Sequence, residues 1–254
     1  MTVFDAYARY YDLLYRDKDY AGEARFVLER LEAHGPCPES LLDLGCGTGA
    51  HCRRFLERVP QVHGLDRSRG MIERALAGSA PDAAWPRYHL GDVRQARLGF
   101  SLDAVVSLFH VASYQTTNAD LEAMLATARA HLRPGGLFLF DFWYGPAVLS
   151  APPAVRIRRV EDQATRVTRI SEPRLDHRAC TVEVAYRLFV SDKASGRVEE
   201  LTESHLMRYL FEPELALLAQ AQGFGILETA PWMEAGRPPA QDDFGVYAVL
   251  RRLP

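Results

Sequence analysis

One glycine-rich segment constrains the fold of this chain more than any other feature. Residues 41–49 have the sequence Leu-Leu-Asp-Leu-Gly-Cys-Gly-Thr-Gly, and a helical pattern follows them to about Arg58. Glycine lets a backbone turn sharply and approach a ligand closely, because it has no Cβ. A helix after such a turn offers unpaired N–H groups and the positive end of its dipole. The segment therefore predicts a strand, a ligand-binding turn and a helix.

The alternation of strand and helix continues along the chain. Apolar strands are predicted at residues 40–44, 61–65, 87–90, 102–108 and 137–142. Helices are predicted at residues 68–76 and 121–132, and a turn at 134–136. Near-continuous apolar strands that alternate with helices are typical of a parallel sheet covered on both faces. We expect Pro213 to begin a last helix over 215–222, before two closing strands, 226–228 and 244–250, that form a hairpin at the sheet edge.

Two other segments have different patterns. Apolar residues near the N-terminus recur at spacings of three and four, which predicts an amphipathic helix that carries Phe4, Tyr7, Tyr10, Tyr11 and Leu14. A second helix is expected from Glu23 to Ala33. Residues 154–209 instead alternate with a period of two, and the even-numbered residues from Val182 to Val190 fall on one face.

These patterns predict an α/β fold with a Rossmann-like, seven-stranded and mostly parallel sheet. The core is expected to comprise residues 36–150 and 210–254. Residues 1–35 are expected to form an N-terminal helical cap. Residues 151–209 are expected to form an antiparallel β insertion that acts as a lid.

The composition narrows the classes of function. The chain has 254 residues and a formal net charge of −3, which does not favour binding to nucleic acid. Its basic stretch, with Arg156, Arg158, Arg159 and Arg166, is interpreted as solvated strand faces. Scattered cysteines favour a reducing cytoplasm and no metal site. We expect no signal peptide, and no apolar run reaches the ~20 residues of a membrane span.

Three carboxylates lie at the ends of successive predicted strands, where ligands bind in open α/β sheets. Asp43 precedes the glycine turn, and an acid there suits an amino group rather than a pyrophosphate. Asp66 suits a ribose diol, in S-adenosylmethionine (SAM) or NAD alike, and Asp92 suits an adenine amine. Taken singly, each of the three carboxylates could be a cap or turn residue. Gly45-x-Gly47 with a later alanine also fits the dinucleotide fingerprint.

In order and spacing, these motifs resemble those of class I SAM-dependent methyltransferases over residues 40–142. The similar segments are Leu41–Gly49, Val62–Ser68 with Met71, Gly91–Asp92, Leu102–Leu108 and Arg133–Leu137. The resemblance implies SAM as cofactor, bound by Asp43, Gly45, Gly47, Asp66, Met71 and Asp92. It implies backbone contacts from Cys46, Val93, Leu108 and Phe109.

A narrower resemblance is to bacterial aminosugar N-methyltransferases, which act on sugar nucleotides and carry a β lid in the same place. It rests on Tyr11-Asp12-Leu13, Lys18-Asp19-Tyr20, Trp143 and Glu203-Ser204-His205. Tyr114 stands where those enzymes tend to carry a histidine, and Asp141 where some have glutamate. The resemblance implies methyl transfer to the amine or hydroxyl of a sugar or sugar nucleotide.

Methyl transfer requires alignment, exclusion of water and removal of a proton from the acceptor. Tyr11 and Tyr20 are candidates to face the sulfonium, because aromatic rings attract cations. His110, just past the fourth strand, is the candidate base, and Tyr114 is a second catalytic candidate. The acceptor pocket is expected to contain Asp141, Trp143, Tyr144 and His205. Core packing or a purely structural histidine would explain several of these residues equally well.

Other functions stay open at this point. The acceptor could be another small amine, a carboxylate or a phenol. An NAD(P) oxidoreductase would leave Asp43 and Asp92 without a role, and a SAM-binding protein without transferase activity is a further alternative. A homodimer is possible.

Overall fold

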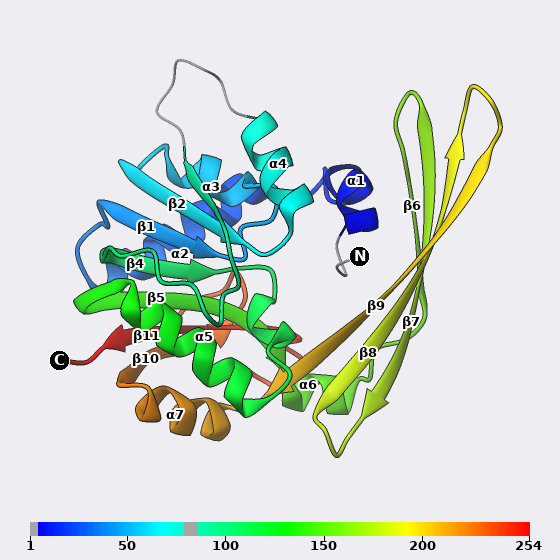
Figure 1. The fold of residues 1–254 in the computed structure, drawn as a ribbon. Coiled ribbons are helices and arrows are strands. Elements are labelled where there is room, and N and C mark those ends of the chain that lie inside the picture. The colour runs from blue at the N-terminus through cyan, green and yellow to red at the C-terminus, as the bar shows by residue number, and fades with distance from the viewer. Residues whose placement is uncertain (1–4, 79–85) are drawn as a thin grey trace.

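Across the described residues, 5–78 and 86–254, the computed structural model has a central sheet of seven strands (Figure 1). Five parallel strands lie in the order β3 (Arg87–Leu90), β2 (Gln61–Asp66), β1 (Ser40–Leu44), β4 (Leu102–Ser107) and β5 (Leu132–Tyr144). Antiparallel β11 (Gly245–Arg252) pairs with β5, and β10 (Phe224–Pro231) pairs with β11. The predicted Rossmann-like, mostly parallel sheet is confirmed.

Helices cover both faces of this sheet. One face packs against α2 (Tyr20–His34) and α3 (Ala50–Phe55), and the other against α5 (Asn118–Ala130) and α7 (Glu212–Ala221). The shorter helices are α1 (Asp5–Leu14), α4 (Arg69–Ala77), the 3-10 helix η1 (Val111–Tyr114) and α6 (Gly145–Ser150).

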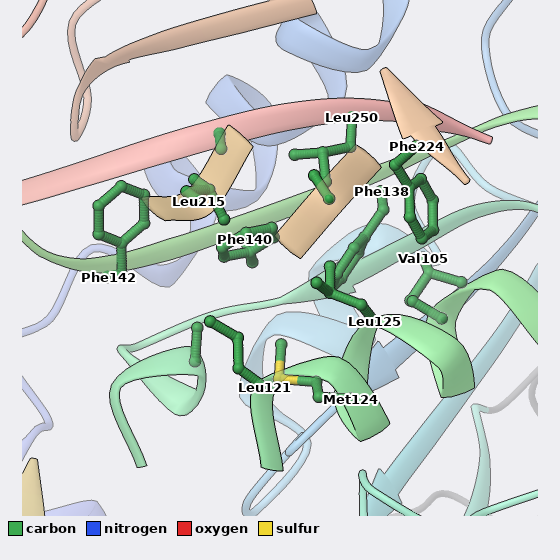
Figure 2. Close-up of a cluster of buried hydrophobic side chains, with 14 of the residues drawn as sticks. Val105, Leu121, Met124, Leu125, Phe138, Phe140, Phe142, Leu215, Phe224 and Leu250 are labelled. Carbon is green, nitrogen blue, oxygen red and sulfur yellow. The ribbon is translucent and has the colours of Figure 1, made fainter. Parts of the chain in front are cut away.

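Strand β5 shows how the two faces divide the apolar residues. Phe138, Phe140 and Phe142 pack with α5 and α7 in the cluster that Figure 2 shows, whereas Leu137 and Leu139 pack with α2. Successive side chains of a strand point to opposite faces, so a strand buried on both faces must be apolar throughout. This explains the near-continuous apolar runs.

Polar caps fix where two helices begin. Ser68 accepts a hydrogen bond from Met71 N (3.3 Å) before α4, and Thr117 accepts one from Asp120 N (3.1 Å) before α5. Such a cap contributes about 1 kcal/mol. The cap at Thr117 starts α5 three residues before the predicted position.

The predicted turn at 134–136 lies inside β5 instead of before it. Leu102 of β4 pairs with Leu132, and Ala104 pairs with Leu137, so the segment between Leu132 and Leu137 bulges out of the ladder. Gly135 adopts a φ of +80°, which glycine tolerates without strain. A turn-forming sequence therefore makes a bulge here, because strand pairing continues on both sides of it.

Four long antiparallel strands form a twisted ribbon that extends away from the core (Figure 1). They are β6 (Arg156–Glu161), β7 (Thr165–Asp176), β8 (Thr181–Asp192) and β9 (Val198–Leu210). The end of β9 pairs in parallel with β5, through Trp143 with Tyr209 and Tyr144 with Leu210. On its other edge, Trp143 pairs with Gly245 of β11. Strand β9 therefore lies along the same edge of β5 as β4, beyond the point where β4 ends. The ribbon thus continues the central sheet.

Helix α1 packs on one face of the ribbon, which we call the inner face. Its Leu14 is buried among Val160, Val167, Leu188 and Val190. Val167 lies opposite both Val160 and Val190, and Leu188 is on the same face of β8 as Val190. Phe4, the first member of the predicted aromatic stripe, lies outside the described residues.

The described ranges contain no helix long and apolar enough to cross a membrane. Within the same ranges, no three His, Cys, Asp or Glu side chains are grouped to hold a metal ion.

Candidate active site

A cavity that is partly open to solvent lies at the C-terminal ends of the parallel strands, between the core, α1 and the ribbon. Most of the sequence-predicted site residues line it. They are Tyr11, Tyr20, Gly45, Cys46, Gly47, Asp66, Met71, Asp92, Val93, Leu108, Phe109, His110, Tyr114, Trp143 and His205. The structure therefore brings together residues from α1, the glycine turn, the ends of β2, β3, β4 and β5, and β9.

The glycine turn is docked on β2. Gly45 N and Cys46 N donate to Leu65 O at 2.7 and 3.0 Å, and Gly47 N donates to Asp66 Oδ2 at 2.9 Å. Gly47 has a φ of +55°, and no atom lies within 4 Å of the position that a Cβ would take. The turn therefore leaves open space against its backbone at the edge of the cavity.

Asp43 lies behind this turn and is fully buried. Its Oδ2 accepts from Cys52 Sγ at 3.5 Å, while Oδ1 has no hydrogen-bond partner in the part of the chain that the structure describes. Desolvation raises the pKa of Asp43 to about 6. Unlike Asp66 and Asp92, Asp43 does not line the cavity itself. A buried carboxylate oxygen without a donor is costly, so a donor that reached Oδ1 would stabilise it.

The other two carboxylates differ in their environments. Asp66 accepts from Gly47 N and from Ser68 N (2.8 Å), yet burial still raises its pKa. Asp92 is paired with Arg94, whose Nε and Nη2 lie 2.9 and 2.6 Å from its oxygens, and these bonds lower its pKa. Arg94, which also lines the cavity, was not predicted from the sequence.

His110 is held rigidly beside the cavity. Its backbone N–H donates to both oxygens of Asp141 (3.0 and 3.1 Å), and its Nδ1 lies 2.8 Å from Asp141 Oδ2. Phe109 and His110 both have positive φ values, 65° and 64°, which cost non-glycine residues roughly 1–3 kcal/mol each. Asp141 therefore positions His110. It does not line the cavity, which corrects the expectation from the sequence.

Tyr114 and His205 meet across the cavity wall. Tyr114 Oη lies 2.7 Å from His205 Nδ1, and Glu203 Oε2 lies 3.1 Å from His205 Nε2. Burial raises the pKa of Tyr114 well above its ordinary value. Glu203 was noted only as part of a sequence resemblance and was not predicted as a site residue.

Helix α1 and the segment after it close the cavity on the side of the glycine turn. Asp12 accepts from Thr48 Oγ1 at 2.9 Å, which ties α1 to the glycine turn. The Lys18 Nζ atom lies 4.5 Å from the Phe109 ring centroid. Burial raises the pKa of Tyr20, so its hydroxyl stays neutral. These contacts hold aromatic rings around the cavity.

Tyr144 does not line the cavity, which corrects the sequence-based expectation. Its ring packs in the cluster of α5 and α7, and its hydroxyl donates to Glu212 Oε2 at 3.1 Å. It follows Phe138, Phe140 and Phe142 on one face of β5, so the alternation of the strand turns it toward the core.

Sequence reasoning missed several lining residues, among them Tyr15, Arg67, Tyr186 and Met207. Tyr15 continues the spacing of Tyr11 by four residues. Tyr186 and Met207 lie on the same ribbon face as His205, so alternation combined with the strand register would have found them.

Comparison with known proteins agrees with this geometry. Residues 41–136 match the family model described as a methyltransferase domain. The chain is 33% identical over 229 residues to the dTDP-3-amino-3,4,6-trideoxy-alpha-D-glucopyranose N,N-dimethyltransferase of Streptomyces venezuelae, and the match covers 89% of this chain and 93% of the relative.

This chain belongs to the class I SAM-dependent methyltransferases. The methyltransferase is also 32% identical to the dTDP-3-amino-3,6-dideoxy-alpha-D-glucopyranose N,N-dimethyltransferase of Streptomyces fradiae, over 91% of this chain and 88% of the relative. A solved SAM-bound structure of an amino pentose methyltransferase from Micromonospora echinaspora superimposes with a TM-score of 0.75, at 29% identity over 99% and 97% of the two chains.

The cofactor of the methyltransferase is SAM, and the site fits it. The unpartnered Oδ1 of Asp43 suits the ammonium group of a methionine moiety, and the open space at Gly47 admits a ligand against the backbone.

Proposed function

We propose that this methyltransferase methylates the amine of an amino sugar linked to a nucleoside diphosphate. The observation that carries the proposal is one continuous cavity from the glycine turn to the inner face of the ribbon. The two dTDP-aminosugar N,N-dimethyltransferases match about nine tenths of the chain, so the matches include most of the ribbon as well as the cofactor side.

In this proposal the three carboxylates bind the cofactor. Asp66 accepts from both ribose hydroxyls, Asp92 from the adenine amine, and Asp43 from the ammonium group, directly or through water. Backbone at Cys46, Val93 and Leu108 completes the contacts, and Met71 packs nearby. Tyr11 and Tyr20 face the sulfonium, whose charge a well-placed ring stabilises by about 0.5–2 kcal/mol.

The acceptor side is formed by polar groups against an aromatic wall. Trp143, Tyr186 and Met207 provide apolar surface, and Tyr114 and His205 provide hydrogen-bonding groups. His110, whose backbone is fixed by Asp141, lies beside the acceptor and can hold it by a hydrogen bond. When bound, SAM supplies the methyl group and a neutral sulfide leaving group. The protein aligns the amine and excludes water.

Two arginines on the ribbon support a diphosphate in the acceptor. Arg158 of β6 pairs directly with Arg169 of β7, and like charges in that arrangement destabilise a sheet. Their guanidinium carbons lie 5.7 and 5.8 Å from the ring centroid of Tyr15, which lines the cavity. Guanidinium groups bind phosphate oxygens in bidentate fashion. Arg158, expected to be solvated, is half-buried at this position.

The proposal is tested by a panel of acceptors. The purified methyltransferase would be incubated with SAM and, in turn, a dTDP-linked amino sugar, the same amino sugar without dTDP, a phenol and a carboxylate. We expect N-methylated dTDP-sugar by mass spectrometry, with kcat/KM roughly 100-fold above that of the free sugar, because each charge-assisted hydrogen bond to phosphate contributes about 1.5–3 kcal/mol. Preference for the free sugar, phenol or carboxylate would refute the proposal. Absence of S-adenosylhomocysteine release with every acceptor would favour a non-catalytic role.

We expect SAM binding to weaken in acid because of Asp43. Its pKa of about 6 means that the carboxyl is ionised above that pH and protonated below it. An ammonium ligand favours the ionised form, so SAM affinity should be constant above about pH 7 and fall up to tenfold per unit below pH 6. Calorimetric titration from pH 5 to 8 measures this. Asp43→Asn should bind weakly at pH 8 and lose the pH dependence, and an unchanged slope in the variant would exclude Asp43 as its source.

We also propose that the acceptor is a free small molecule and not nucleic acid, and that the methyltransferase acts in the cytoplasm, as a homodimer. Light scattering after size exclusion measures the oligomeric state. An assay with oligonucleotides in place of the sugar tests the choice of acceptor.

A further inference from the structure

Three side chains, of which Glu203 and His205 are buried and Tyr114 is half-buried, form a continuous hydrogen-bonded chain that ends in the cavity. Glu203 and His205 lie on the inner face of β9, and Tyr114 lies at the end of η1, more than eighty residues away in sequence. The exposed fractions of the Glu203 and His205 side chains are 7% and 3%. Tyr114 and His205 line the cavity, and Glu203 lies behind them.

The chemistry of the three groups fixes the direction of these hydrogen bonds. An ionised carboxylate only accepts, so His205 Nε2 must carry the proton that Glu203 Oε2 accepts. In the neutral imidazole, Nδ1 is then the acceptor, and the Tyr114 hydroxyl must donate to it. Any further hydrogen bond to the tyrosine oxygen is therefore one that this oxygen accepts.

We infer that Tyr114, His205 and Glu203 form a proton relay that removes a proton from the acceptor amine. The inference rests on the proposed function, because only an amine or hydroxyl acceptor has a proton to lose. Once the nitrogen has formed its bond to the methyl carbon and the carbon–sulfur bond has broken, the nitrogen is an ammonium. One N–H proton passes to Tyr114 Oη as the hydroxyl proton passes to His205 Nδ1.

The proton ends on His205 as an imidazolium beside the Glu203 carboxylate, and it later leaves to solvent. The amine regains its lone pair and can accept a second methyl group. Glu203 does not touch the acceptor, so it is a positioning residue: it sets the tautomer of His205 and stabilises the imidazolium.

Other charged or titratable groups face this chain from every neighbouring element. They are Tyr15 after α1, Arg67 after β2, Arg169 of β7 and Tyr186 of β8. The ring centroid of Tyr186 lies 4.8 Å from that of His205. None of these four neighbours is acidic, whereas Glu203 is. Replacing Glu203 therefore changes the charge next to His205 more directly than replacing any of them.

The relay is tested with Glu203→Gln, which keeps the shape and removes the charge. The control is Glu200→Gln, the same substitution on the same strand, at a side chain that is 53% exposed. With a dTDP-linked amino sugar, we expect Glu203→Gln to lower kcat roughly 100-fold near pH 7, at the lower end of the range of acid–base effects. The deficit should shrink as the pH rises toward the pKa of the amine, because solvent then removes the proton. The KM for SAM and the control should stay near the parent values.

A deficit that is equal at every pH, or no deficit at pH 7, would overturn the relay. If Glu203→Gln does not fold, Tyr114→Phe must show the same pH-dependent deficit, and its absence would count equally against the relay. NMR of protein with ¹⁵N-labelled histidine provides a readout without any acceptor. His205 should be the Nε2–H tautomer in the parent, and the Nδ1–H tautomer would also overturn the inference. If the parent enzyme methylates no amino sugar, the proposed function is refuted. The tautomer of His205 can still be measured in that case, so the two failures are distinguishable.

Discussion

Asp66→Ala is expected to weaken SAM binding by roughly 100-fold or more, because two hydrogen bonds to a charged carboxylate contribute about 1.5–3 kcal/mol each. The carboxylate ends β2 with its oxygens oriented by Gly47 N and Ser68 N. Burial raises the pKa of Asp66, so solvent stabilises its charge poorly, and we expect the ribose hydroxyls to supply that stabilisation. Isothermal titration with SAM and with S-adenosylhomocysteine measures the loss.

Removing Asp66 also removes the acceptor of Gly47 N, so the turn itself could shift. Asp66→Asn keeps a side-chain oxygen in place and should lose less affinity than the alanine variant. Thermal unfolding without ligand separates a weakened turn from a lost ribose contact. SAM affinity equal to that of the parent in Asp66→Ala would mean that the ribose lies elsewhere.

Gly45→Ala is expected to lower the melting temperature by roughly 5–15 °C and to abolish SAM binding. Gly45 has a φ of +87°, and a Cβ there would lie 2.6 Å from Val111 Cγ2 and 2.9 Å from Cγ1. Backbone strain of about 1–3 kcal/mol adds to overpacking of about 1–3 kcal/mol, and each kcal/mol lowers the melting temperature of a chain of this size by about 2–4 °C.

Two glycine controls divide this effect into its causes. Gly99→Ala has a similar φ of +80° and nothing within 4 Å of the new Cβ, so it reports backbone strain alone. Gly47→Ala places its Cβ in open space inside the turn, so it should melt like Gly99→Ala yet bind SAM poorly. If Gly45→Ala melts no lower than Gly99→Ala, contact with Val111 does not constrain the turn.

The strands of the core were predictable because burial on both faces requires apolar residues throughout. The start of β5 was not, since a local pattern cannot distinguish a turn at 134–136 from a bulge. The bulge exists because residues before and after it pair with β4, and those partners lie about thirty residues away.

The cofactor side of the cavity was also predictable, since its residues follow successive strands at fixed places. The acceptor side of the cavity was only partly predictable. Alternation along β9 groups Glu203, His205 and Met207 on one face, but which face meets the core depends on the pairing of Tyr209 with Trp143. Arg94 escaped prediction for a similar reason, because its ion pair with Asp120 joins the loop after β3 to α5, a segment distant in sequence.

The pairing of β9 with β5 has a consequence for how such enzymes diversify. Because side chains alternate with a period of two, deleting one residue between Tyr209 and His205 would exchange His205 for the outward-facing Ser204. We therefore expect related enzymes to lack insertions and deletions in that short stretch. Point substitutions at inward positions, by contrast, leave the backbone ladder untouched. New acceptors can then be acquired one side chain at a time, without disturbing the half of the protein that carries the methyl donor.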